Sequence, residues 1–128
     1  MPDKRQTLIT TSINGLKNDV NNIFLGNWCA KEEYILRNKN VVRYHWDDRK
    51  KLKKDYIYLN NLYEKLLEAT KAKLNHYHQV NYSKNYWRIH AGYWLYSFVC
   101  SLFEKWENID QAFKENPDIN FTKVIKIF

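Results

Sequence analysis

The longest stretch of this sequence, residues 47–115, carries apolar side chains at helical spacing. In its first half they recur every three or four residues, at Leu52, Tyr56, Leu59, Tyr63, Leu66 and Leu74. This repeat predicts a long helix with one apolar face, ending near His78 before the break at Gln79-Val80-Asn81. Asp47 stands where the N-cap belongs, and Asp48 adds negative charge to the first turn.

A second helix is expected from Ser83, a suitable N-cap, to a point before Pro117. Its apolar residues cover nearly all of its faces: Tyr86, Trp87, Ile89, Tyr93, Trp94, Leu95, Phe98, Val99, Leu102, Phe103 and Trp106. A helix that is apolar on every side is normally buried, and a chain of 128 residues offers little to bury it completely. We therefore expect this helix to pack against something outside the chain.

The ends of the chain read as short strands. Thr7–Thr11 and Val41–Tyr44 are β-prone, and the apolar run Ile23-Phe24-Leu25 ends at Gly26. We expect an α/β fold with short parallel-type strands at the N-terminus and two long aromatic-rich helices. Residues 1–46 form its strand and loop part, 47–115 its helical part, and 116–128 a truncated strand. With only three Gly and two Pro there is no linker, so the chain reads as a single partial domain.

The formal net charge is +7, which favours anionic partners such as nucleic acid, phosphate groups or an acidic membrane surface. A genome bias towards Lys, Asn, Ile and Tyr explains the charge equally well. The only cysteines, Cys29 and Cys100, are too far apart for a metal motif or a disulfide framework. Neither a signal segment nor an apolar run long enough to span a membrane is present. We expect a cytoplasmic protein with reduced thiols.

One candidate site surrounds the start of the first helix. His45, Asp47, Asp48 and Arg49 precede a run of lysines there, and helix N-termini attract anions. An anionic substrate would relieve the repulsion between the cations and the helix dipole. The competing interpretation, which we favour, is a solvated basic face capped by Asp47, with a structural role for His45.

Two further candidate binding sites are each defined by one or two residues. Arg88 lies among aromatic residues and needs an anionic partner, either a carboxylate such as Asp47 or Asp48 or a ligand phosphate. A structural salt bridge is the favoured alternative. Asn27 and Trp28 follow an expected strand, where α/β proteins commonly bind ligands, although no dinucleotide or P-loop motif is present. Cys29 is expected to be inert, no metal site is predicted, and no catalytic residue is assigned.

Taken together, these motifs resemble the N-terminal region of transferases encoded in bacterial O-antigen and other surface-carbohydrate gene clusters. The resemblance covers about residues 7–113. It rests on Leu8–Thr11, Phe24–Cys29, His45–Arg49, Tyr56–Glu64, and Tyr86–Ile89 with Gly92-x-Trp94-Leu95. The sequence departs from the family's pattern at Ile13–Leu16 and at Tyr93.

The resemblance implies part of a Rossmann-like N-terminal domain in a two-domain, glycosyltransferase-like protein. The missing C-terminal domain would then be the partner of this chain and would bind a nucleotide-activated donor, so this segment holds no cofactor. His45, Asp47, Asp48, Arg49 and Arg88 would lie near the interdomain cleft, with the arginines holding anionic groups. The alternatives are a basic, aromatic nucleic-acid-binding module, which is less favoured, and a helical interaction or scaffold domain.

Overall fold

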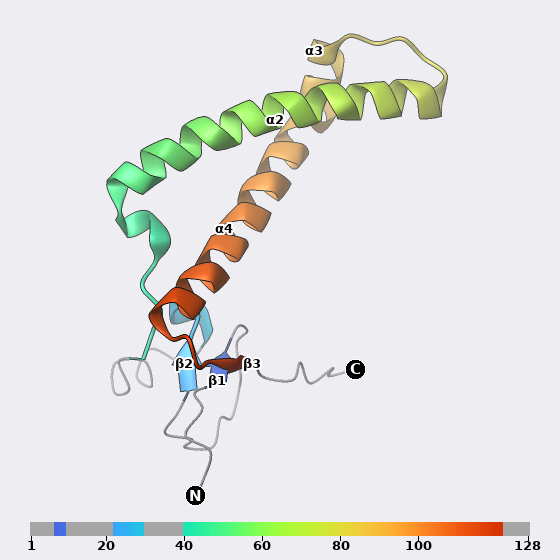
Figure 1. The fold of residues 1–128 in the computed structure, drawn as a ribbon. Helices are drawn as coiled ribbons and strands as arrows, with labels where there is room; N and C mark the ends of the chain where they lie inside the picture. Colours follow the sequence, from blue (N-terminus) through green and yellow to red (C-terminus); the bar gives the residue numbers. More distant parts are fainter. Residues whose placement is uncertain (1–6, 10–21, 30–39, 122–128) are drawn as a thin grey trace, which may run out of the picture. The chain divides into compact units, whose positions relative to one another are not determined.

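The computed structural model describes residues 7–9, 22–29 and 40–121 (Figure 1). The chain divides into two compact units. We call residues 1–47 with 107–128 the strand unit, and residues 48–106 the helical unit. Each is described by itself.

Three short strands form the sheet of the strand unit. They are β1 (Thr7–Ile9), β2 (Asn22–Phe24) and β3 (Asn120–Phe121), all parallel, in the order β2-β1-β3. Val41 adds a parallel bridge beside Phe24, where the Phe24 amide donates to Asn40 and the Val42 amide donates to Phe24, each over 2.8 Å. The sheet therefore continues past β2 by one bridge residue.

The core of the strand unit is small and apolar. It comprises Leu8, Ile23, Phe24, Leu25, Cys29, Val42, Ala112 and Ile119. Asn22 is the exception at the start of β2: its side chain is buried, and its Nδ2 has no hydrogen-bond partner among the described residues.

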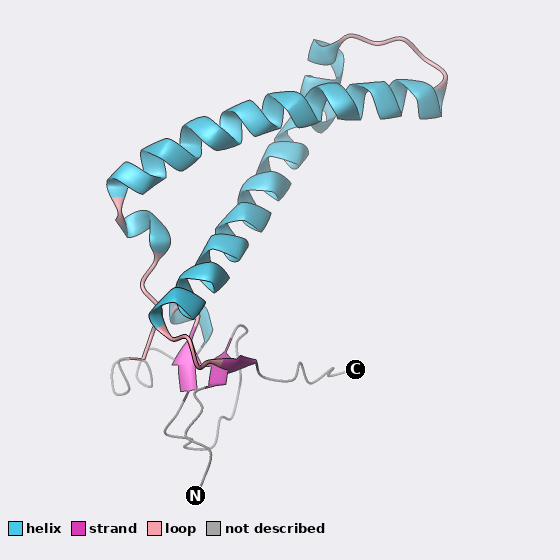
Figure 2. Cartoon of the chain, viewed as in Figure 1, coloured by secondary structure: helices cyan, strands magenta, loops and turns pink. Residues whose placement is uncertain are grey.

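The prediction of an α/β, Rossmann-like fold is wrong. Helices make up most of the described residues, whereas the strands are only two or three residues long (Figure 2). A Rossmann-like domain alternates strands with helices, but here the longest elements are helices that follow one another along the chain. The aromatic-rich stretch takes the helical structure that its periodicity dictates. The β-prone runs form only short parallel strands, and the strand predicted at Val41–Tyr44 is reduced to the single bridge residue Val41, so they do not build such a domain. Residues 122–128 of the predicted final strand lie outside the described residues.

The first predicted helix is confirmed as α2 (Arg49–His78). Its N-cap is Asp48 and not Asp47, because the extended backbone of Asp48 lets its carboxylate accept from the amides of Lys50 and Lys51. The helix ends at Gln79, which has φ 53° and ψ 43°, the left-handed conformation of a helix C-terminus. The predicted break at residues 79–81 is therefore present.

The second predicted helix is present but interrupted. It consists of α3 (Lys84–Trp87), the π-helical segment η3 (Arg88–Gly92) and α4 (Tyr93–Glu115). Ser83 caps α3 as predicted, with its hydroxyl accepting from the amide of Tyr86 over 3.1 Å. Single π-turns of this kind lie frequently at functional sites.

Within the helical unit, α2 packs against the elements that follow it. Leu59 and Leu67 of α2 are buried, as are Leu95 and Val99 of α4. The Asn75 side chain joins the loop to both helices: it donates to the carbonyl of Tyr82 and accepts from the Tyr82 amide and the Trp87 indole. None of the described helices is long and apolar enough to cross a membrane.

Candidate functional site

Two short turns lie at the carboxyl edge of the parallel strands in the strand unit. One is η1 (Asn27–Cys29), which follows β2, and the other is η2 (His45–Asp47), which follows the bridge at Val41. Because β2 and the Val41 bridge run in the same direction, their carboxyl ends lie at one edge. Ligands commonly bind at this edge of parallel sheets.

The first turn presents an exposed indole. Trp28 is 51% exposed, and its ring lies so close over Gly26 that a Cβ at Gly26 would collide with it. The Cys29 amide donates to the Gly26 carbonyl over 3.1 Å and closes the turn. Asn27 is exposed as well. The turn therefore holds an aromatic ring and an amide side chain at the surface.

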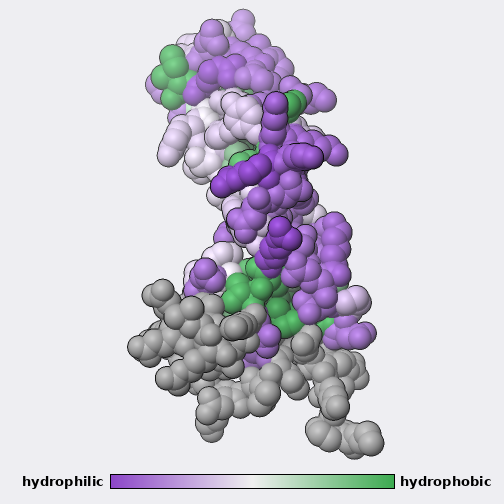
Figure 3. All heavy atoms as spheres, turned by 90° about the vertical axis from the view of Figure 1, so that its left-hand side faces the viewer, coloured by the Kyte–Doolittle hydropathy of each residue, from purple (hydrophilic) through white to green (hydrophobic). Residues whose placement is uncertain are grey.

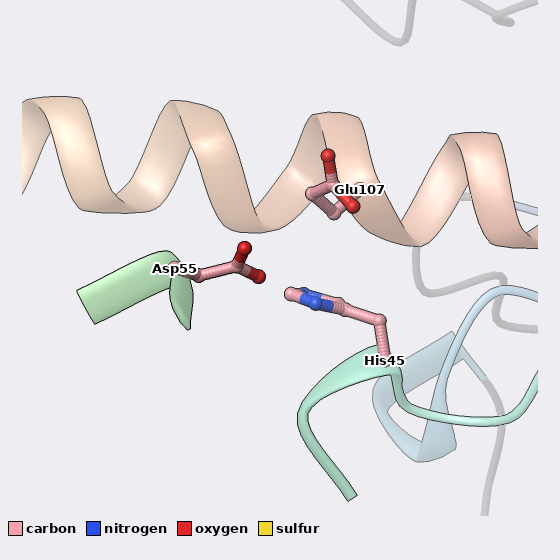
Figure 4. A group of neighbouring side chains, drawn as sticks. All are labelled: His45, Asp55 and Glu107. Carbon is pink, nitrogen blue, oxygen red and sulfur yellow. The ribbon is translucent and has the colours of Figure 1, made fainter. Parts of the chain in front are cut away.

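The second turn holds a buried histidine. His45 is 4% exposed and contacts the rings of Tyr44 and Trp46, with centroid distances of 5.1 and 4.6 Å. Glu107, which α4 contributes to the same unit, has a carboxylate oxygen within 4.8 Å of an imidazole nitrogen of His45 (Figure 4). Asp55, also labelled there, belongs to α2 of the helical unit.

A carboxylate beside a buried imidazole can fix its tautomer and stabilise the imidazolium once it takes up a proton. The pair could also ligate a metal ion. However, two ligands from one unit are fewer than the three protein ligands of most catalytic zinc sites. Sequence reasoning missed Glu107, because 62 residues separate it from His45 and no local motif marks it.

The residues of the predicted anion site at the start of α2 do not all have the role that was expected of them. Asp48 uses its carboxylate as the helix cap, so it is engaged with backbone amides. Arg49 is exposed on the first turn of α2, and Asp47 is exposed in η2 of the other unit. Asp48 therefore has a structural role, whereas Arg49 remains accessible to an anion.

Arg88 has a protein partner. Its guanidinium donates to both carboxylate oxygens of Glu64, over 2.6 and 3.0 Å, and it lies 5.7 Å from the centroid of the Tyr63 ring. Lys84 also contacts Glu64, at 2.8 Å. The bonds from Arg88 and Lys84 lower the pKa of Glu64 to about 2, and the bond to Glu64 raises the pKa of Arg88. This is the structural salt bridge that the sequence favoured over a ligand phosphate, but its carboxylate is Glu64 and not the expected Asp47 or Asp48.

Neither Cys29 nor the two histidines at the end of α2 add to the candidate site. Cys29 is fully buried, and burial raises the pKa of its thiol, so it remains a poor nucleophile. His76 and His78 are both exposed in the last turn of α2, two residues apart and therefore on different faces.

The family comparison gives one match. A family model described as LIC12162 family transferase matches residues 6–127, which takes in both units. No curated protein and no solved structure matches the sequence.

Proposed function

This chain belongs to the LIC12162 family of transferases, and we propose that it forms the acceptor side of a glycosyltransferase-like enzyme in surface-polysaccharide assembly. The observation that carries the proposal is the buried His45–Glu107 pair at the strand edge that also presents Trp28. A transferase needs a group that removes a proton from the acceptor, and this pair is suited to that task.

In the proposed reaction, His45 takes the proton from an acceptor hydroxyl at one ring nitrogen. The carboxylate of Glu107, which lies within 4.8 Å of an imidazole nitrogen, stabilises the imidazolium that forms. The acceptor oxygen then forms a bond to the anomeric carbon of the donor sugar, as the bond between that carbon and the leaving nucleoside diphosphate breaks. Burial of His45 keeps bulk water away from the imidazole, which favours transfer over hydrolysis.

Trp28 binds the acceptor in this proposal. An exposed indole face offers apolar contact to the C–H groups of a sugar ring, and the neighbouring amide of Asn27 can bond to sugar hydroxyls. Arg88 takes no part, because Glu64 occupies its guanidinium. The nucleotide-activated donor binds to a part of the enzyme outside this segment, and the reaction takes place in the cytoplasm.

The test uses the whole protein that contains this chain, supplied with a panel of nucleotide sugars and acceptor oligosaccharides. Release of nucleoside diphosphate is measured for His45→Asn, Glu107→Gln and Trp28→Ala, with Asp47→Asn as an exposed control from the same turn as His45. We expect His45→Asn to lower kcat by about a hundredfold or more and Glu107→Gln by less. Trp28→Ala should mainly raise KM for the acceptor. If folded His45→Asn keeps full activity, the assignment is wrong.

A further inference from the structure

The helical unit carries nearly all of the net charge of the chain. Between residues 48 and 106 there are eleven Lys and Arg but only five Asp and Glu, a net charge of +6 out of +7. Four of the five acidic groups have these partners: Asp48 caps α2, Asp55 pairs with Lys51, Glu64 with Arg88, and Glu68 with Lys71. The unit is therefore strongly cationic, with few acidic groups left to neutralise it.

Three lysines lie together on the first two turns of α2. Lys50, Lys53 and Lys54 are exposed, and none of them has an ion pair among the described residues. Ile57 follows one turn later and is 53% exposed. Positions 50, 53, 54 and 57 share one helical face, so an aliphatic side chain continues the line of lysines. We call these four residues the cationic stripe.

The same unit exposes a second line of side chains, and these are apolar. Trp94, Phe98 and Leu102 stand four residues apart on α4 and are 63%, 48% and 54% exposed. The face drawn in Figure 3, coloured by hydropathy, is mostly hydrophilic and has separate hydrophobic patches. A folded domain that leaves Trp, Phe, Leu and Ile exposed among cations has the composition of an interfacial surface.

We propose that the helical unit binds an anionic membrane surface, with the cationic stripe of α2 facing the lipid headgroups. The charge complementarity is direct, because anionic headgroups attract each nearby Lys or Arg and an aliphatic side chain can enter the headgroup boundary. The contact is peripheral, since no described helix can cross the bilayer. This proposal is independent of the chemistry assigned to His45.

The observations favour lipid over nucleic acid. Binding of single strands by aromatic residues depends on open ring faces, but the rings of Trp94 and Phe98 stack on each other at 5.3 Å and 9°. Ile57 and Leu102 have no stacking surface at all. Aliphatic and aromatic side chains beside lysines are instead the pattern of helices that lie on membranes.

The test is co-sedimentation of the 128-residue chain with phosphatidylcholine vesicles that contain or lack phosphatidylglycerol. We expect binding only to the anionic vesicles at about 0.1 M salt, and its loss at about 1 M, where charges are screened within a few ångströms. The double variant Lys53→Gln, Lys54→Gln should weaken binding about thirtyfold. Ile57→Ser should weaken it further while leaving the salt dependence in place.

The matched control is Lys73→Gln with Lys105→Gln, which removes the same charge from exposed positions of the helical unit that do not lie on the face of the stripe. It should weaken binding by a much smaller factor, and circular dichroism should show that all variants remain helical. Equal losses in both double variants, or no binding to anionic vesicles, would overturn the proposal. Tighter binding to single-stranded RNA through the same lysines would overturn it too.

Discussion

Arg88 in η3 and Glu64 in α2 form a bidentate ion pair that joins these two elements of the helical unit. Both Nη atoms donate to the carboxylate, over 2.6 and 3.0 Å, and Lys84 adds a third contact. Both side chains are more than one-third exposed, so solvent screens the pair and its contribution to stability is modest. Its main effect is to fix how η3 lies against α2.

The pair makes stability depend on acid pH. The pKa of Glu64 falls from its ordinary 4.5 to about 2 in the folded chain, so folding is favoured while this carboxyl is ionised. The contribution is fully present above about pH 4.5 and is lost as the pH falls towards 2. We expect the urea midpoint of the wild type to fall more steeply between pH 5 and 2 than that of Glu64→Gln. Parallel curves would show that the pair contributes nothing.

Gly92, at the end of η3, packs closely against Tyr63 and Arg88. A Cβ at this position would lie 2.6 Å from the Tyr63 hydroxyl and 3.3 Å from Cγ of Arg88. Gly92→Ala should therefore destabilise the chain by about 1 kcal/mol, because overpacking outweighs the gain in helix propensity. Thermal unfolding measures the change.

The matched background for this test is Tyr63→Phe, which removes the hydroxyl that the new methyl group would meet. In that background Gly92→Ala should be close to neutral or stabilising. An equal loss in both backgrounds would place the cause elsewhere, in the backbone of η3.

Local sequence patterns predicted the helices well. The repeat from Leu52 to Leu74 and the cap at Ser83 reflect interactions within a few residues, which the sequence itself displays. The fold class was wrong because the β-prone runs are real but short, and the Rossmann-like architecture came from a family resemblance. No helical period distinguishes the π-turn at Arg88–Gly92 from α-helix, although Gly92 marks its end.

The sequence did not predict which residues far apart along the chain contact each other. Arg88 needed a carboxylate, but nothing local selects Glu64, 24 residues away, from the other acidic residues. The same holds for Glu107 beside His45. The prediction of Asp47 as the cap was wrong by one residue, because adjacent aspartates cap equally well and the sequence alone does not separate them. The backbone conformation selects Asp48, which is extended, whereas Asp47 lies within η2.

The two aspartates make a direct test of capping. Asp48→Ala should cost about 1 kcal/mol, because two amides of the first turn of α2 lose their acceptor. Asp48→Asn should retain most of the stability, and Asp47→Ala should change it little. Urea unfolding followed by circular dichroism distinguishes the three variants. A larger loss for Asp47→Ala would place the start of α2 one residue earlier.

The two thiols should differ widely in reactivity. Cys29 is fully buried in the core of the strand unit, so a thiol reagent cannot reach its sulfur. Burial also raises the pKa of the thiol, so little of the reactive thiolate is present. Cys100 on α4 is only half-buried. In the native chain we expect Cys29 to react slower than Cys100 on the order of a hundredfold or more, because it must wait for local unfolding. Cys100→Ala should leave one slow thiol that becomes fast in denaturant, and Cys29→Ala should leave one fast thiol. Fast native labelling of Cys29 would mean that the small core of the strand unit opens readily, which its burial does not allow.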